Sequence, residues 1–468
     1  MDSIWPYMLP LFTEPRKRIK LLLQLFSSPI AVEVLETIGL AGSISQKDII
    51  NTLKHHSNKT IINVLKKLVE TGILEESTIR KRSGLRTVWT KQYKLTNLGK
   101  WFYTLIVDPS RIPKGELKEL ATSIYESLGR GMYDVAKYLN YDPIENFRHA
   151  LYGLAKYLIS KNSNMKKKEV LVAGGLSLDH HFKLLSDELQ YLRSLLGGDG
   201  AIVSTIMSKL KLGPILLTEA ACDLWSLKWL IELSESDVTL NNVKLSKDKN
   251  IAENVIVNTN NGDELRIYKI VNESRATSPN VNEVNWLNLY DLKAYYSGIT
   301  FIEIAYKISE LAYTSNSPFI YRPTLESMIH NLGLFKKILE KKPILIISKN
   351  TYNKLYGKLG ISCNDLIGLG AKTLILIISP TRAIVFTREC KRIELKVKEI
   401  KIRQLINTIN TFTSFFIYYI LKGEDYSSSV KKSLIASALT STKSMPYTFP
   451  STSEVEECNL EVEESVER

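Results

Sequence analysis

Basic side chains that could bind phosphate groups are concentrated between residues 42 and 100. This stretch has twelve lysines and arginines against four acidic residues, and its net charge of +8 is most of the +13 of the 468-residue chain. Such a cationic stretch favours a nucleic acid as the partner, because charge dominates binding to the phosphate backbone. The polar and basic residues that we assign to this contact are Ser57, Asn58, Lys59, Thr60, Asn63, Lys66, Lys67, Arg80, Lys81, Arg82 and Arg86.

Cysteine and histidine form no pattern that is typical of a metal site. The four cysteines are scattered, with no CxxC pair and no Cys/His cluster, which argues against a disulfide framework as well. The adjacent pairs His55-His56 and His180-His181 have no carboxylate or cysteine partner at ligand spacing. We therefore expect no metal and no cofactor, and we interpret both histidine pairs as incidental.

The elements that position the basic residues follow from the apolar spacing. Residues 29–41 and 45–54 have the spacing of short helices, and a longer helix begins at about Ser57 and stops at Gly72. Residues 73–96 contain two β-rich segments around the turn Ser83-Gly84, which predicts a hairpin. A further helix is expected to begin near residue 96.

This order of helices and hairpin resembles the winged helix-turn-helix of prokaryotic and archaeal transcription regulators. We expect this domain to span residues 1–110. The resemblance implies that the helix from Ser57 enters the major groove of duplex DNA, and that the hairpin tip, with Arg80 to Arg86, contacts phosphate or the minor groove. The alternative for the polar helix face is a solvated surface without a partner.

The remaining chain divides into three regions. Residues 111–167 have helical periodicity and form a connector, in which the polar segment 160–168 is the best candidate for a linker. From Glu169 on, β-rich runs such as PILIIS and TLILIIS alternate with helical stretches, which predicts an α/β domain with a mostly parallel sheet over residues 168–452. Residues 453–468 are rich in glutamate, and we expect a short helix or a disordered acidic tail.

Five segments of the α/β region, taken in order, resemble the ribokinase-like (PfkB) carbohydrate and nucleoside kinase family. They are residues 170–182, 195–225, 254–270, 366–390 and 406–455. The resemblance implies that Asp179 contacts substrate hydroxyl groups, that Gly197, Gly198 and Asp199 belong to a substrate loop, and that residues 254–270 form a lid hairpin. The plain structural alternative is that Asp179 ends a strand and that the glycines form a tight turn.

The catalytic signature of that family is missing. Its Gly-Ala-Gly-Asp falls on Asn407-Thr408-Ile409-Asn410, within the stretch 404–410. The glycines would expose backbone N–H groups to the transferring phosphoryl group, and the Asp would take a proton from the attacking hydroxyl. An amide at 410 has no useful basicity, and Ile409 places a branched side chain beside the anion. We interpret Asn410 as a helix cap and assign no catalytic residue.

Three further positions depart from the family. The Asn-x-x-Glu motif that organises magnesium falls on Ser348 to Thr351, and the glycines of the nucleotide-covering turn fall on Ser379 and Arg382. The Asn expected in the substrate loop is Ile202. The nucleotide side therefore departs from the pattern more than the sugar side.

Together these features predict a transcription regulator whose inactive kinase-like domain serves dimerisation or binds a small sugar or nucleoside. We expect double-stranded DNA as the partner, a homodimer, a cytoplasmic location at the nucleoid and no contact with a membrane. The alternatives are an active sugar or nucleoside kinase with an appended DNA-binding domain, and a nucleoid-associated protein with little sequence specificity.

Overall fold

The structure is a computed structural model in which the chain forms two compact units, residues 1–146 and 147–468. It describes residues 28–39, 42–83, 86–106, 142–161, 168–185, 188–258, 265–269, 275–276, 278–298, 300–389, 391–398, 400–443 and 447–467, with isolated positions between 115 and 133. Among the helices of these described residues, none is long and apolar enough to cross a membrane.

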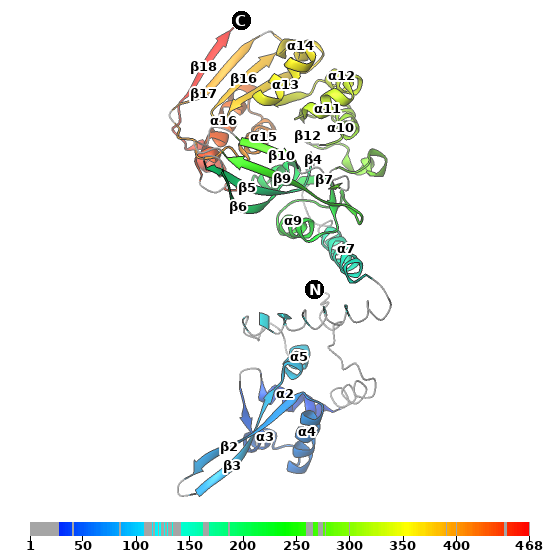
Figure 1. The fold of residues 1–468 in the computed structure, drawn as a ribbon, viewed down its shortest axis with the longest axis vertical. Helices are drawn as coiled ribbons and strands as arrows, with labels where there is room; N and C mark the ends of the chain where they lie inside the picture. Colours follow the sequence, from blue (N-terminus) through cyan, green and yellow to red (C-terminus); the bar gives the residue numbers. More distant parts are fainter. Residues whose placement is uncertain are drawn as a thin grey trace. The chain divides into compact units, whose positions relative to one another are not determined.

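The N-terminal unit contains the helices and the hairpin that the sequence predicts (Figure 1). Its helices are α2 (Pro29–Ile38), α3 (Gln46–Thr52), α4 (Asn58–Glu70) and α5 (Asn97–Ile106). The long strands β2 (Leu74–Ser83) and β3 (Arg86–Leu95) pair antiparallel, and β1 (Ile44–Ser45) adds to the free side of β3. Ser45 and Ser57 cap α3 and α4, because each hydroxyl accepts a hydrogen bond from a backbone N–H of the first turn.

A small apolar core holds these elements together. The buried faces of the helices contribute Val34, Leu35, Ile49, Ile61 and Leu65, all of which are fully buried, and the hairpin adds Leu74, Tyr93 and Leu95. In α4 the buried residues recur three or four positions apart, so the opposite side of this helix remains polar and exposed. The fold therefore presents one face of α4 to solvent along its length.

The helix α7 (Pro143–Lys161) belongs largely to the C-terminal unit. Its Leu151 and Ala155 are buried in that unit's core. The stretch 162–167, which makes up most of the predicted linker, lies outside the described residues.

The C-terminal unit is built on a ten-stranded, largely parallel sheet, as the sequence predicts (Figure 1). Its order is β18-β17-β16-β15-β14-β13-β12-β4-β7-β8. The parallel part comprises β4 (Val170–Ala173), β7 (Pro214–Ala221), β8 (Val243–Ser246), β12 (Ala294–Ser297), β13 (Phe319–Tyr321), β14 (Ile344–Ser348) and β15 (Thr373–Ser379). The antiparallel edge comprises β16 (Arg382–Thr387), β17 (Arg392–Val397) and β18 (Val462–Glu467).

Helices cover both faces of this sheet, which explains why its strands are continuous apolar runs. One face packs against α7, α8 (Asp199–Lys209), α9 (Leu224–Glu235), α15 (Thr408–Leu421), α16 (Tyr426–Thr442) and α17 (Thr452–Glu456). The other packs against α10 (Ile302–Thr314), α11 (Leu325–His330), α12 (Leu332–Glu340), α13 (Lys349–Leu359) and α14 (Cys363–Gly368). Alternate residues of one strand enter different cores, as Ile346 and Ile347 of β14 do.

A second, smaller sheet, which we call the lid, contacts the large sheet at β7. Its order is β10-β9-β5-β6, with β5 (Ser177–Leu185), β6 (Glu188–Gly197), β9 (Asn250–Asn258) and β10 (Leu265–Lys269), and β11 (Arg275–Ala276) pairs with β9. The two strands of the hairpin predicted over 254–270 are confirmed as β9 and β10, which pair antiparallel. Asp179 does not end the first strand, because that strand stops at Ala173 and Asp179 lies within β5.

The acidic C-terminal segment begins with a short helix, which is one of the two expected alternatives, but it continues as a strand and not as a disordered tail. After the short helix α17, β18 pairs antiparallel with β17 at the sheet edge. Two of its glutamates form ion pairs with lysines. Oε1 of Glu463 lies 3.0 Å from Nζ of Lys398, and Oε2 of Glu464 lies 2.5 Å from Nζ of Lys431. The charges that suggest disorder in isolation are paired here across the sheet edge.

Candidate functional site

A cavity of about 200 Å³ lies where the lid meets the carboxyl ends of the parallel strands. In open α/β sheets this edge is where ligands bind, because loops from neighbouring strands converge there. Side chains from the lid, from the start of α8, from the end of β13 and from the start of α15 line it. They are Ser177, Asp179, Gly198, Asp199, Ile202, Asn254, Ile256, Arg322, Leu405, Ile406, Asn407, Ile409 and Asn410.

Asp179 is buried on the lid side of the cavity. One of its carboxylate oxygens, Oδ1, accepts hydrogen bonds from Ser177 Oγ at 2.8 Å and from Asn254 Nδ2 at 2.7 Å. Burial raises the pKa of Asp179, and the two hydrogen bonds oppose that rise without cancelling it. Its other oxygen packs against Gly197, where a Cβ would lie 2.0 Å from Oδ2. Gly197 itself does not line the cavity, but it makes room for this carboxylate.

Asp199 begins α8 and is fixed by two hydrogen bonds. Its Oδ1 accepts the backbone N–H of Gly175 at 3.1 Å, and its Oδ2 accepts the hydroxyl of Tyr296 at 3.3 Å. Gly198, with φ of +99°, turns the chain from β6 into the helix and packs against the backbone of Gly175. The substrate loop that the resemblance implies therefore brings Gly198 and Asp199 to the cavity beside Asp179.

The start of α15 lies at the same cavity. Asn407 is the N-cap residue and adopts a left-handed conformation with φ of 62°, so Asn410 is not the cap that the sequence suggests. Asn410 lies inside the first turn, where its Nδ2 donates to Asn407 Oδ1 at 3.1 Å. Its Oδ1 accepts a hydrogen bond from Arg322 Nη1 at 2.5 Å.

Arg322 places a cation beside the position at which the family pattern has its catalytic Asp. It follows β13 directly, and the sequence does not reveal it because 88 positions separate it from Asn410. An amide that accepts from a guanidinium is neither basic nor available to take a proton from a hydroxyl. The arrangement offers hydrogen bonds to hydroxyl groups from two carboxylates and three amides, beside an apolar wall that includes Ile202 and Ile409.

The positions that the resemblance assigns to the nucleotide side have local structural roles. Ser348 caps α13, since its Oγ accepts the backbone N–H of Thr351 at 3.2 Å. Ser379 accepts the backbone N–H of Thr381 within the turn between β15 and β16, and Arg382 donates to Glu394 at 2.6 Å. Each of these side chains is thus engaged in the fold of its own turn or strand.

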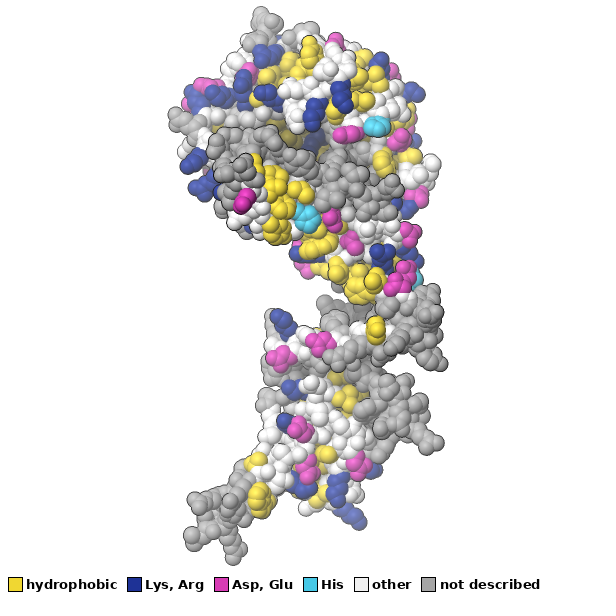
Figure 2. Space-filling model, viewed as in Figure 1, with side chains coloured by type: hydrophobic (Ala, Val, Ile, Leu, Met, Phe, Trp, Pro, Cys, Tyr) yellow, Lys and Arg dark blue, Asp and Glu magenta, His cyan; other side chains and the backbone are white. Residues whose placement is uncertain are grey.

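The N-terminal unit presents a second candidate surface along α4. Ser57, Asn58, Lys59, Thr60, Asn63, Lys66 and Lys67 are all exposed. In Figure 2, Lys and Arg side chains lie on the part of this unit where Figure 1 draws α4. The side chains of Arg80, Lys81, Arg82 and Arg86 lie outside the described residues.

The hairpin also carries an aromatic residue that sequence reasoning missed. Trp89 on β3 is 67% exposed, and it stands opposite Arg80 in the register of β2 and β3. Strand alternation puts Trp89 on the same face of β3 as the buried Tyr93 and Leu95, but Trp89 lies nearer the hairpin tip and outside the apolar core, so its exposure could not be predicted from the alternation.

Comparison with known proteins shows the fold of the C-terminal unit. No family model matches the chain, and no curated protein matches it. Among solved structures, it is similar to a nucleoside kinase from Burkholderia thailandensis in complex with inosine, with a TM-score of 0.52 and 14% identity over 62% of this chain and 96% of that one. The C-terminal unit therefore has the ribokinase-like (PfkB) fold.

Two further solved structures are similar to this chain in fold. The fructokinase from Xylella fastidiosa with bound ATP has a TM-score of 0.50 and 14% identity, over 63% of this chain and 98% of that one. The ribokinase from Arabidopsis thaliana complexed with ribose and ATP has a TM-score of 0.50 and 15% identity, over 62% of this chain and 97% of that one. At such low sequence identity, the structural similarity shows the fold and leaves the activity open.

Proposed function

We propose that the protein is a DNA-binding regulator whose N-terminal unit is a winged helix-turn-helix. The observation that carries the proposal is the exposed polar face of α4, with Lys59, Lys66 and Lys67, on a unit that also has a long basic hairpin. In this arrangement the residues near the start of α4 reach base edges, and the lysines near its end contact phosphates. The hairpin contacts the adjacent backbone or minor groove.

Fluorescence anisotropy with a labelled duplex tests this proposal. Each phosphate contact contributes about 0.9 to the slope of log affinity against log salt, so the variant Lys66→Gln/Lys67→Gln should lower the slope by about 2 and weaken binding at low salt. The matched control is Lys336→Gln/Lys337→Gln, which removes two exposed adjacent lysines from α12 of the other unit. No binding by the wild type, or equal losses in both variants, would refute the proposal.

We further propose that the C-terminal unit binds a small polyhydroxylated ligand, such as a sugar or a nucleoside, without transferring phosphate. Support comes from the cavity, in which Asp179, Asp199 and Asn254 can pair with hydroxyl groups. The first turn of α15 carries the amide of Asn410 in place of a carboxylate, and this amide accepts a hydrogen bond from Arg322, so it cannot act as the base. Binding without chemistry would make the unit a sensor.

A specific observation favours the active kinase as a second candidate: the cavity keeps two carboxylates beside a guanidinium. A panel of sugars and nucleosides, assayed by calorimetry and for ATP-dependent phosphorylation, separates the two. The sensor predicts binding that Asp179→Asn weakens, with no phosphorylated product. Phosphorylation that Asp179→Asn abolishes would establish the kinase and refute the sensor.

We also propose a homodimer, because a dimer reads two half-sites of an operator at once. Figure 2 shows hydrophobic side chains gathered over β5 and β6, and on β6 Leu189, Tyr191 and Leu192 are each about half exposed. Light scattering should give a dimer that Leu189→Ser/Leu192→Ser dissociates, whereas Leu287→Ser, at an 82% exposed position, leaves it intact.

Selection of binding sites from random DNA should yield a sequence motif, and the absence of a motif would favour a nucleoid-associated protein.

A further inference from the structure

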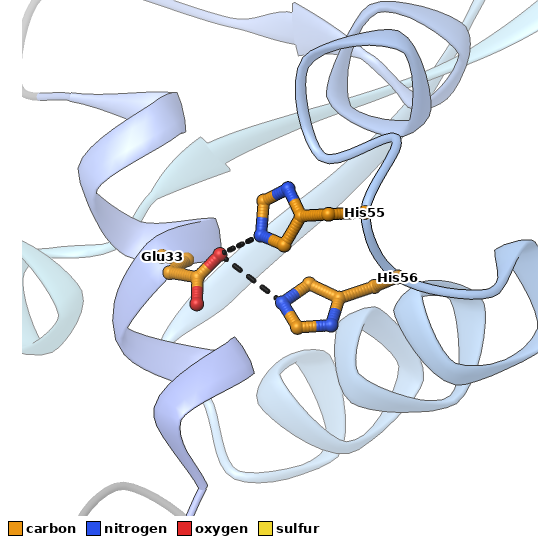
Figure 3. Close-up of side chains that lie close together, drawn as sticks. All are labelled: Glu33, His55 and His56. Carbon is orange, nitrogen blue, oxygen red and sulfur yellow. Dashed lines mark hydrogen bonds and ion pairs between the residues drawn. The ribbon is translucent and has the colours of Figure 1, made fainter.

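Three potential metal ligands meet in the N-terminal unit (Figure 3). Oε2 of Glu33, on α2, lies 2.7 Å from Nε2 of His55 and 3.1 Å from Nε2 of His56, both in the turn between α3 and α4. Their ligand atoms all lie within 4.8 Å of one another. Sequence spacing does not indicate this cluster, because Glu33 precedes His55 by 22 positions.

The fold holds the three side chains together from both sides. On α2, the apolar stripe that includes Val34 and Leu35 packs into the core, which leaves Glu33 on the flank of the helix. On the other side, Leu53 is buried shortly before the histidines, and Ser57 caps α4 immediately after them. The backbone of the turn is thus fixed at both ends, and both imidazoles point toward α2 (Figure 3).

The ligand types and spacing fit a borderline transition-metal ion. Two imidazole nitrogens and one carboxylate oxygen are common zinc ligands, and in a tetrahedral site such atoms lie roughly 3.4 Å apart, at roughly 2.0–2.2 Å from the ion. The present separations of 2.7 and 3.1 Å need to widen by roughly 0.7 and 0.3 Å to reach this spacing. His55, whose side chain is 59% exposed, leaves an entry path for the ion and for a water as the fourth ligand.

We propose that Glu33, His55 and His56 form a binding site for Zn²⁺ or a similar divalent transition-metal ion. The ion replaces the hydrogen bonds between the carboxylate and the imidazoles with metal–ligand bonds, and it joins α2 to the turn that leads into α4. Imidazole ligands select such ions over Mg²⁺ and Ca²⁺, which prefer oxygen. The site does not depend on the proposed DNA binding, although it fixes the start of the helix to which that function is assigned.

Calorimetric titration of the full chain, after removal of metal with a chelator, tests the site. The wild type should bind one equivalent of Zn²⁺ and should not bind Mg²⁺. Glu33→Gln and His56→Asn should each weaken Zn²⁺ binding by at least about tenfold, since even groups that only orient a ligand contribute that much. The controls Glu36→Gln on the same helix and His330→Asn in the other unit should bind as the wild type does.

Hydrogen exchange locates the bound ion, and circular dichroism shows whether a variant is misfolded. In Glu33→Gln the new amide oxygen could still accept hydrogen bonds from both imidazoles, so this variant should keep the far-ultraviolet circular dichroism of the wild type. Zn²⁺ should slow exchange of the amides between residues 53 and 60 in the wild type but not in Glu33→Gln. No Zn²⁺ binding by the wild type, unchanged binding in both ligand variants, or protection confined to other segments would each overturn the proposal.

Discussion

His181 should make the C-terminal unit sensitive to acid, because its imidazole is buried without compensation. The side chain lies in β5 and is 1% exposed, and among the described residues neither ring nitrogen has a hydrogen-bond partner. Burial lowers the pKa of His181 to about 4, with smaller contributions from the charges of Arg193 and His180. The unfolded chain has the ordinary histidine pKa of about 6.5.

The difference between these two pKa values sets the size and sign of the effect. Between about pH 6.5 and pH 4 the unfolded state binds a proton that the folded state does not, so the free energy of unfolding falls as the pH falls. One pKa unit corresponds to about 1.4 kcal/mol, and a depression of about 2.5 units is worth about 3 kcal/mol in full. Of this, about 2 kcal/mol should be lost between about pH 7 and about pH 4.5.

Urea unfolding of the wild type and of His181→Leu at these two pH values measures the effect. The wild type should lose about 2 kcal/mol more than the variant, because every other titrating group contributes equally to both proteins and cancels. His330→Leu, at an exposed position, is the control and should lose as much as the wild type. Equal losses in wild type and His181→Leu would show that the imidazole titrates normally in the folded state and would refute the argument.

Three further predictions concern the cavity and the sheet edge. Gly197→Ala should destabilise the fold by about 1–3 kcal/mol, because its Cβ would lie 2.0 Å from Asp179 Oδ2; an unchanged urea midpoint would contradict this packing. A double-mutant cycle of Arg322→Ala and Asn410→Ala should give a coupling of about 1.5–3 kcal/mol in unfolding free energy, as for a hydrogen bond to a charged group, whereas additive effects would exclude the contact. Deletion of residues 461–468 should uncover β17 and cause self-association in light scattering; a protein whose mass distribution is unaffected would show that β18 does not protect the edge.

The strands of the large sheet could be predicted from the sequence because helices bury both of its faces. Runs such as residues 344–348 and 373–379 are apolar at every position or nearly so, and this is the pattern of a parallel sheet. The lid strands β5 and β6 have one face away from the core and mix polar with apolar residues, so the hairpin they form was missed. The pairing of β18 was missed for a related reason, since its glutamates gain their partners only from Lys398 and Lys431.

The candidate sites could be predicted only where one segment supplies the residues. The exposed face of α4 and the turn with Gly198 and Asp199 each belong to a continuous stretch, so spacing or resemblance indicated them. Arg322 and Glu33 could not be found in this way, because each reaches its partners through a tertiary contact. A missing catalytic residue can be recognised from one sequence motif, whereas the group that takes its place can be identified only from the three-dimensional structure.

If the proposed ligand binding and DNA binding are coupled, the packing of α7 offers one route, because this helix follows the segment that connects the two units along the chain. Leu151 and Ala155 of α7 belong to the same core cluster as Ile202 and Val203 of α8, the helix that begins with Asp199 at the cavity. A ligand alters DNA binding only if its affinity differs between two states of the chain, and DNA must then alter ligand affinity by the same factor. A ligand that binds Asp179 with equal affinity in both states would therefore occupy the cavity without regulating the N-terminal unit.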